Sequence, residues 1–278
     1  NNECDKLYIV DIDGKNFTEF PLKDGAFTCA YYSLNDSYIF FSSTMHLGED
    51  CPEIYKDPNP RKYIWPLRDY EIYRYDGEEV IQLTDYPGYN AETTIHPTEE
   101  KVIFTSLRDG DINLFEMDYN GENVVQITRE YGYDGGAFYS PEGNRIVWRA
   151  WYPSTDKEKK QWKNNLSKKF IESVPLDIYV ADRDGSNKQR LTNTGATNWS
   201  PAWHPDGKHI VFSSSVKGII NYKNNKQINP IALNYQFTLH SAVPAPHTII
   251  SGINNGLISS TKATPATIDY ICAHLSCR

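Results

Sequence analysis

The stretch that decides the fold is residues 177–214, DIYVADRDGSNKQRLTNTGATNWSPAWHPDGKHIVFSS, because its landmarks return elsewhere in the chain at fixed distances. The landmarks are Gly185 in an Asp-Gly turn, Thr192, Pro205 in a His-Pro-Asp-Gly turn, and Phe212, at successive spacings of 7, 13 and 7 residues. Such self-similarity at a period of 20 to 50 residues indicates stacked supersecondary units.

Two other copies keep these spacings without a gap, and a weaker copy opens the chain. Their landmarks are Gly77, Thr84, Pro97 and Phe104; Gly121, Thr128, Pro141 and Trp148; and, in the weak copy, Gly14, Pro21, Leu34 and Phe41. The period is 44 residues from Thr84 to Thr128 but 64 from Thr128 to Thr192. The difference indicates insertions, which we place near 45–68 and 151–175.

Each copy reads as four strands. In the best example, residues 91–95, 101–106, 112–118 and 124–128 alternate apolar and polar side chains between Gly- and Pro-containing turns. An aromatic content of 13% also favours sheet. Four strands in about 44 residues is the measure of a propeller blade. We therefore predict an all-β β-propeller of four-stranded blades, incomplete, with three whole blades centred on residues 26–84, 91–128 and 136–192 plus partial blades.

The repeat resembles that of the TolB-like (WD-repeat-like) β-propellers. Residues 177–214 match the family pattern nearly throughout, and residues 133–150 and 44–51 resemble a bacterial extracytoplasmic branch of it. The resemblance covers about residues 7–215, so we assign 1–215 to TolB-like repeats. It implies a periplasmic or secreted envelope component that binds a protein, peptide or glycan.

The resemblance stops after Ser215. Residues 217–278 contain six charged side chains and no recurrence of the repeat motifs. We treat 216–278 as a divergent tail that is poorly packed and removed early by proteases; a small extra unit that closes the propeller is the alternative. The chain begins without Met or a leader, which fits a processed form or a fragment.

Composition excludes two classes of partner. A formal net charge of −8 argues against nucleic acid, which requires clustered Lys and Arg. No run of 18 apolar residues is present, so we expect no transmembrane segment. The five cysteines are compatible with one or two disulfides or with unpaired thiols.

Known catalytic signatures are missing from the sequence. It contains no G-x-S-x-G, H-E-x-x-H, Walker or G-x-G-x-x-G motif, and we expect no cofactor and no metal. The prediction is a non-catalytic binding or scaffold protein. The alternative is the propeller part of an enzyme, either a prolyl-oligopeptidase-type peptidase without its hydrolase domain or a metal-assisted polysaccharide lyase.

The candidate ligand site is the mouth of the propeller channel, which the leading residues of the innermost strands surround. The polar members are Asn90, Glu92, Asp134 and Asn198, and the aromatic walls are Tyr89, Tyr133 and Trp199. Such an amphipathic ring suits a peptide, a sugar or a cation. A channel that holds only water is the alternative.

Other polar groups have structural interpretations. We expect His96 and His204 to cap turns rather than to bind metal. His46, Glu49, Asp50 and Cys51 lack established metal-ligand spacing, which favours a Pro-stiffened loop over 45–68. Residues 156–172 are predicted to form a helix on the blade edge, with Trp162, Leu166 and Phe170 on one apolar stripe.

Overall fold

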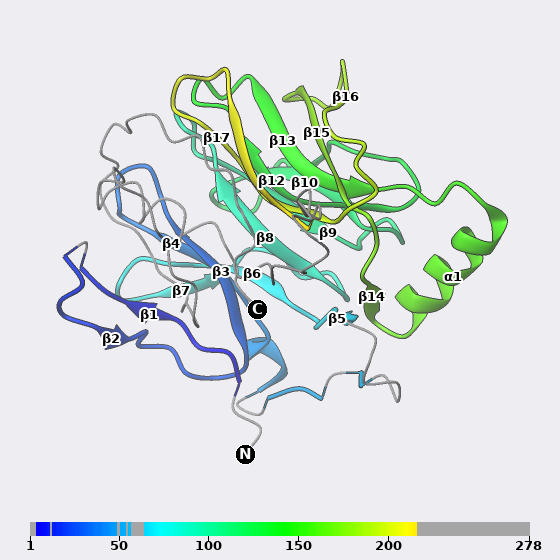
Figure 1. The fold of residues 1–278 in the computed structure, drawn as a ribbon. Coiled ribbons are helices and arrows are strands. Elements are labelled where there is room, and N and C mark those ends of the chain that lie inside the picture. The colour runs from blue at the N-terminus through cyan, green and yellow to red at the C-terminus, as the bar shows by residue number, and fades with distance from the viewer. Residues whose placement is uncertain (1–3, 12, 49–50, 54, 57–63, 216–278) are drawn as a thin grey trace, which may run out of the picture.

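The computed structural model describes residues 4–11, 13–48, 51–53, 55–56 and 64–215, and this part of the chain is almost entirely β (Figure 1). It contains three four-stranded antiparallel sheets, which follow one another along the sequence. The first sheet has the order β3 (Phe27–Tyr32), β4 (Ile39–Ser43), β6 (Glu71–Tyr75), β7 (Val80–Gln82). The second has the order β8 (Asn90–Ile95), β9 (Lys101–Ser106), β10 (Asn113–Asp118), β11 (Val125–Gln126). The third has the order β12 (Tyr133–Tyr139), β13 (Arg145–Trp151), β15 (Asp177–Asp182), β16 (Gln189–Arg190). The predicted all-β class and four-stranded units are confirmed.

Two strand pairs flank these sheets. β1 (Tyr8–Ile9) pairs with β2 (Thr18–Glu19), and β17 (Asn198–Trp203) pairs with β18 (Ile210–Ser214). The two pairs are separate sheets, and within the described residues the strands show no closed propeller. The tail predicted for 216–278 lies outside the described residues.

The repeat landmarks have the structural roles that the sequence suggested. The Thr hydroxyl that ends each unit accepts a backbone N–H from the third strand of its own sheet. The pairs are Thr84 with Ile72 at 2.8 Å, Thr128 with Leu114 at 2.9 Å, and Thr192 with Ile178 at 3.0 Å. Gly121 and Gly185 have a φ of +85° and lie against the backbone carbonyls of Leu83 and Ile127 in the preceding sheet, so a side chain at either position would collide.

The sheets pack face to face through the aromatic positions of the repeat. Phe104 and Trp148 are fully buried in neighbouring apolar clusters, and Phe212 is half-buried beside the third sheet. Neighbouring sheets are also joined by backbone hydrogen bonds, such as the 2.9 Å bond from the Asp134 N–H to the Ile112 carbonyl. The repeat therefore determines both the inside of each sheet and its contact with the next.

The two insertions meet in one additional layer. β5 (Ile64–Pro66), from the first insertion, pairs with β14 (Phe170–Glu172), from the second. Helix α1 (Asp156–Ser167) precedes β14 and begins with a capping box between Thr155 and Glu158. We call β5, β14 and α1 the accessory layer; Figure 1 shows them together at one end of the sheets.

The predicted helix is confirmed, with a shorter apolar stripe. Trp162 and Leu166 lie in α1, but Phe170 lies in β14 because the chain turns at Lys169, which has a φ of +57°. A 3-10 turn, η1 (Met45–Leu47), follows β4. None of the helices in the described ranges has the length and apolar character needed to span a bilayer.

Candidate functional site

A bulge interrupts the first strand of each four-stranded sheet and of the β17–β18 pair at the same place. β8 contacts both β3 and β12, and β12 contacts β17, so the first strands of successive sheets are neighbours (Figure 1). The bulged residues have left-handed backbone: Cys29, Glu92, Gly136 and Ser200, with φ values of +52°, +59°, +60° and +47°. This conformation is uncommon for residues other than Gly, Asn and Asp, and a bulge changes the direction of the side chains beside it.

Glu92 is the charged member of this set and links two sheets. Its carboxylate forms an ion pair with Arg149 of β13 and accepts hydrogen bonds of 2.9 Å from the Thr105 hydroxyl and from the Gly136 N–H. The side chains of Glu92 and Arg149 are only 10% and 5% exposed. The pair is therefore a buried ionic contact between the second and third sheets.

Arg149 lies among aromatic rings. It donates a 2.7 Å hydrogen bond to the Tyr133 hydroxyl, and its guanidinium carbon lies 3.9 Å from the centroid of the Trp199 ring. Desolvation opposes its charge, but the Glu92 carboxylate outweighs that effect and raises the pKa of Arg149. Its Nε has no hydrogen-bond partner among the described residues. Arg149 thus remains a cation that joins the third sheet to β8 and β17.

The polar residues Asn90, Asp134 and Asn198 occupy one equivalent position at the start of β8, β12 and β17, and all three are buried. Asn90 and Asn198 each accept a hydrogen bond from the serine that faces them on the next strand. These bonds are Ser106 to Asn90 at 2.6 Å and Ser214 to Asn198 at 2.7 Å. Their side chains therefore stabilise the sheets. Their assignment as ligand contacts stays a prediction.

Asp134 breaks the asparagine pattern. Its Oδ1 accepts 2.6 Å hydrogen bonds from the Trp148 indole and the Tyr152 hydroxyl, and its Oδ2 has no partner among the described residues. Burial raises the pKa of this carboxyl to about 7. Asp134 is therefore a buried acid that titrates near neutrality.

The accessory layer covers the three aromatic residues that were expected to wall an open mouth. Tyr89 and Tyr133 are buried in the same apolar cluster as Trp162 of α1, and Trp199 packs against that cluster. The rings of Trp65 and Trp199 lie 5.5 Å apart. The predicted solvated ring is thus closed where the insertions pack on it, because burying aromatic surface is favourable.

A groove remains between the accessory layer and the second sheet. Its volume is about 540 Å³, and of the predicted ring residues it is lined by Tyr89. The apolar floor is formed by Leu67, Tyr89, Leu107 and Leu166. Charged side chains at its edge are Asp69, Lys163 and Lys169. An apolar floor with a few charged groups is the usual composition of a ligand-binding surface.

Lysines are concentrated on α1 and directly after it, and two of them, Lys163 and Lys169, line the groove. Six exposed lysines lie on or directly after α1: Lys157, Lys159, Lys160, Lys163, Lys168 and Lys169. The same segment contains two acidic residues, Asp156 and Glu158, whereas the whole chain carries a net charge of −8. The groove therefore has a locally positive edge on an acidic protein.

Three of the remaining candidates have structural roles. His96 caps its turn as predicted, since Nδ1 accepts N–H bonds from Thr98 and Glu99 at 3.3 and 3.0 Å. His46 lies 3.2 Å from the Tyr73 hydroxyl, and Cys51 forms a disulfide with Cys4. Glu49 and Asp50 lie outside the described residues. Burial raises the pKa of the Cys29 thiol to about 11, so this thiol is not a nucleophile at neutral pH.

The fold and site define a class, a repeat-built all-β protein with propeller-like sheets and a covered axial end. No family model matches the chain. The chain resembles TolB: a 42-residue segment, 15% of this chain, is 43% identical to the Tol-Pal system protein TolB of Desulfosudis oleivorans and spans 10% of that protein.

Solved structures similar to the chain include two TolB proteins. The putative TolB from Agrobacterium tumefaciens is 17% identical, covers 77% of this chain and 91% of its own, and has a TM-score of 0.41. TolB from Acinetobacter baumannii is 16% identical, covers 76% of this chain and 54% of its own, and has a TM-score of 0.41. The resemblance is partial.

Sequence reasoning found Glu92 but missed Arg149. A charged residue in the otherwise apolar run 146–151 of β13 was the available signal, because a buried charge needs a partner. The partner lies 57 residues away, and no local pattern identifies it.

Proposed function

We propose that this protein is a non-catalytic binding protein of the TolB-like type, which takes an acidic peptide or an acidic segment of a protein in the groove beside α1. The observation that carries the proposal is the pair Lys163 and Lys169 at the edge of an apolar-floored groove, beside the other exposed lysines of α1. Of the residues predicted to surround the channel mouth, Tyr89 lines this groove.

The apolar floor and the charged edge of the groove would contribute differently to binding. Apolar side chains of a ligand would bury surface against Leu67, Tyr89 and Leu107, which supplies affinity. Carboxylates of the ligand would meet Lys163 and Lys169, which steers association and selects acidic sequences. A neutral glycan would use the floor but not the lysines, so the charge of the edge favours the peptide.

We also propose that the protein works outside the cytoplasm, in the periplasm or as a secreted protein. The disulfide between Cys4 and Cys51 supports this location, because such bonds persist in oxidising compartments. The resemblance to TolB points the same way.

The proposal is tested by selecting binders from a random peptide display library against the purified chain. We expect enriched peptides to combine two or more Asp or Glu with an apolar or aromatic residue. The Lys159→Glu/Lys163→Glu variant, altered on one face of α1, should bind the enriched peptides at least about tenfold more weakly.

A Lys23→Glu/Lys208→Glu variant is the matched control, because it changes the net charge equally at exposed lysines away from α1. Its affinity should stay within about twofold of the wild type. Enrichment of neutral or basic peptides, or equal losses in both variants, would remove the groove from the proposal. Turnover of a peptide or uronate substrate would overturn the non-catalytic assignment.

A further inference from the structure

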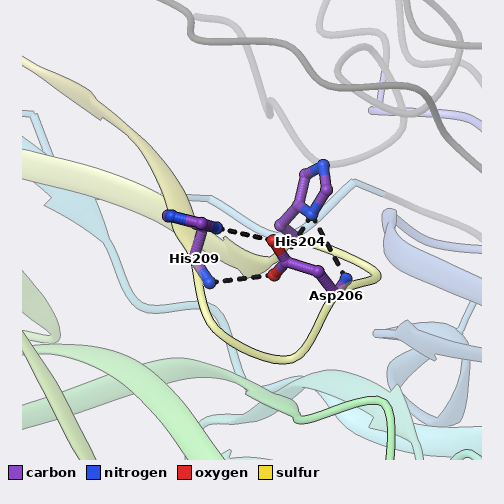
Figure 2. A group of neighbouring side chains, drawn as sticks. All are labelled: His204, Asp206 and His209. Atoms are coloured by element: carbon purple, nitrogen blue, oxygen red, sulfur yellow. Dashed lines mark hydrogen bonds and ion pairs between the residues drawn. The ribbon is translucent and has the colours of Figure 1, made fainter.

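The turn between β17 and β18 brings together two histidines and an aspartate (Figure 2). Nδ1 of His204 lies 3.2 Å from one carboxylate oxygen of Asp206, and Nδ1 of His209 lies 2.6 Å from the other. One ligand atom from each of the three side chains lies within 4.8 Å of the others. Each side chain thus presents a nitrogen or oxygen donor to the same small space.

The repeat explains why these three positions meet. The same turn recurs in the second and third sheets, closed each time by a backbone hydrogen bond from the first position to the carbonyl of the last. These bonds are His204 to His209 at 2.8 Å, His96 to Lys101 at 2.9 Å, and Ser140 to Arg145 at 2.8 Å. The residues equivalent to His204, Asp206 and His209 are His96, Thr98 and Lys101 in one turn and Ser140, Glu142 and Arg145 in the other. Of these three turns, the β17–β18 turn alone has a metal-ligating side chain at all three positions.

The two histidine-containing turns differ in access. His96 is buried, and its Nε2 lies 3.1 Å from the Gly143 carbonyl of the next sheet. In the β17–β18 turn, His209 is 71% exposed and Asp206 is 34% exposed. An ion can therefore reach the β17–β18 turn from solvent, and the exposed His209 ring can rotate to meet it.

Asp206 is held ready as an anionic ligand. Its Oδ1 accepts the backbone N–H groups of Lys208 and His209 at 2.8 and 3.0 Å, which fixes the carboxylate in the turn. These backbone hydrogen bonds, together with the hydrogen bond between Asp206 and the His209 side chain, hold the pKa of Asp206 well below its usual range. The carboxylate of Asp206 is thus held in the turn by the backbone, with both oxygens close to the histidine rings.

We propose that His204, Asp206 and His209 bind one divalent transition-metal ion of the Zn²⁺ class. Metal–nitrogen and metal–oxygen bonds of about 2.0–2.2 Å place tetrahedral ligand atoms about 3.3 Å apart. The present spacings of the ligand atoms run from 2.6 Å to at most 4.8 Å, so small rotations of the side chains bring them to that separation. Two imidazoles and one carboxylate suit Zn²⁺ better than Mg²⁺ or Ca²⁺, which prefer oxygen alone. Binding exchanges the 3.2 Å bond from the Asp206 N–H to His204 Nδ1 for a metal bond and leaves a coordination position for water.

The experiment titrates the tag-free full chain with zinc sulfate by calorimetry and records the melting temperature with and without zinc. We expect one saturable site at pH 7.5 and a zinc-dependent rise in melting temperature. No saturable binding up to millimolar zinc would overturn the proposal.

Substitutions that install the equivalent residues of the other turns test whether Asp206 and His209 bind the metal. His209→Lys and Asp206→Thr install residues of the second turn, and each should weaken zinc binding by at least about tenfold. His96→Ser, which installs the residue of the third turn, is the control and should leave the affinity unchanged. If both ligand variants keep their metal-free melting temperature and bind zinc like the wild type, the ion is held elsewhere and the proposal fails.

Discussion

The repeat sheets and the accessory layer differ in the kind of contact that holds them together. Within the second and third sheets, contacts recur from unit to unit, as in the Thr128 and Thr192 hydroxyls that each close their own sheet. In the accessory layer, β5 and β14 pair across about a hundred residues, and the Trp162 indole donates a 2.8 Å hydrogen bond to Asp111. The sheets are locally encoded, whereas the layer depends on a few distant anchors. Changes in the sheets should therefore cost global stability, and changes in the layer should act locally and on binding.

The largest effect is expected at the ionic contact between the second and third sheets. Arg149→Ala leaves the Glu92 carboxylate buried without its partner, which costs about 3–5 kcal/mol of unfolding free energy. The Glu92→Gln/Arg149→Met variant removes both charges and should recover more than half of that loss. Urea denaturation measures both variants. A loss below about 1 kcal/mol for Arg149→Ala would show that the contact is not essential to the sheets.

The next effect concerns Asp134, whose pKa burial raises from a usual 3.8 to about 7. Between these values the folded chain holds a proton that the unfolded chain has released, so stability falls as the pH rises from about 4 to about 7. The slope approaches about 1.4 kcal/mol per pH unit.

Asp134→Asn keeps an oxygen that accepts from Trp148 and Tyr152 and cannot titrate. We therefore expect the difference in unfolding free energy between this variant and the wild type to change across that window and to level off above it. A difference that stays constant from pH 4 to pH 8 would contradict the assignment.

The accessory layer provides a smaller effect. Trp162→Phe keeps the ring that packs in the apolar cluster but removes the indole donor to Asp111, a buried carboxyl whose pKa burial raises. We expect a loss of about 1–3 kcal/mol, concentrated in α1 and β14. Hydrogen exchange should show faster exchange in these two elements and unchanged protection in β9 and β13. The matched control is Trp151→Phe, at a ring in contact with Trp162; equal losses would mean that packing, not the hydrogen bond, anchors α1.

The same contrast explains what could be read from the sequence. The turn glycines, closing threonines and aromatic positions recur, so the four-stranded units follow from spacing alone. The pairing of β5 with β14 and the ion pair of Glu92 with Arg149 join segments with no shared pattern, so neither could be predicted. Asn90 and Asn198 are predicted from the sequence as ligand contacts, although each accepts a hydrogen bond from a serine at the same position of the next strand. A polar residue at a recurring position more often satisfies the backbone and its neighbours than a ligand.

The smallest stability effect is expected where the accessory layer meets the groove. Lys169 donates hydrogen bonds of 2.9 and 2.6 Å to the Asp69 carboxylate, and the two side chains are 62% and 32% exposed. An exposed pair contributes less than about 1 kcal/mol, so Asp69→Asn should leave urea unfolding nearly unchanged.

The same substitution removes a negative charge from the edge of the groove and releases Lys169, so an acidic peptide should bind more tightly, by up to about fivefold. Lys169→Ala should weaken the same peptide while leaving stability equally unaffected. If Asp69→Asn instead costs more than about 2 kcal/mol, this ion pair is an anchor of the layer; if it weakens the acidic peptide, the groove selects for a different charge.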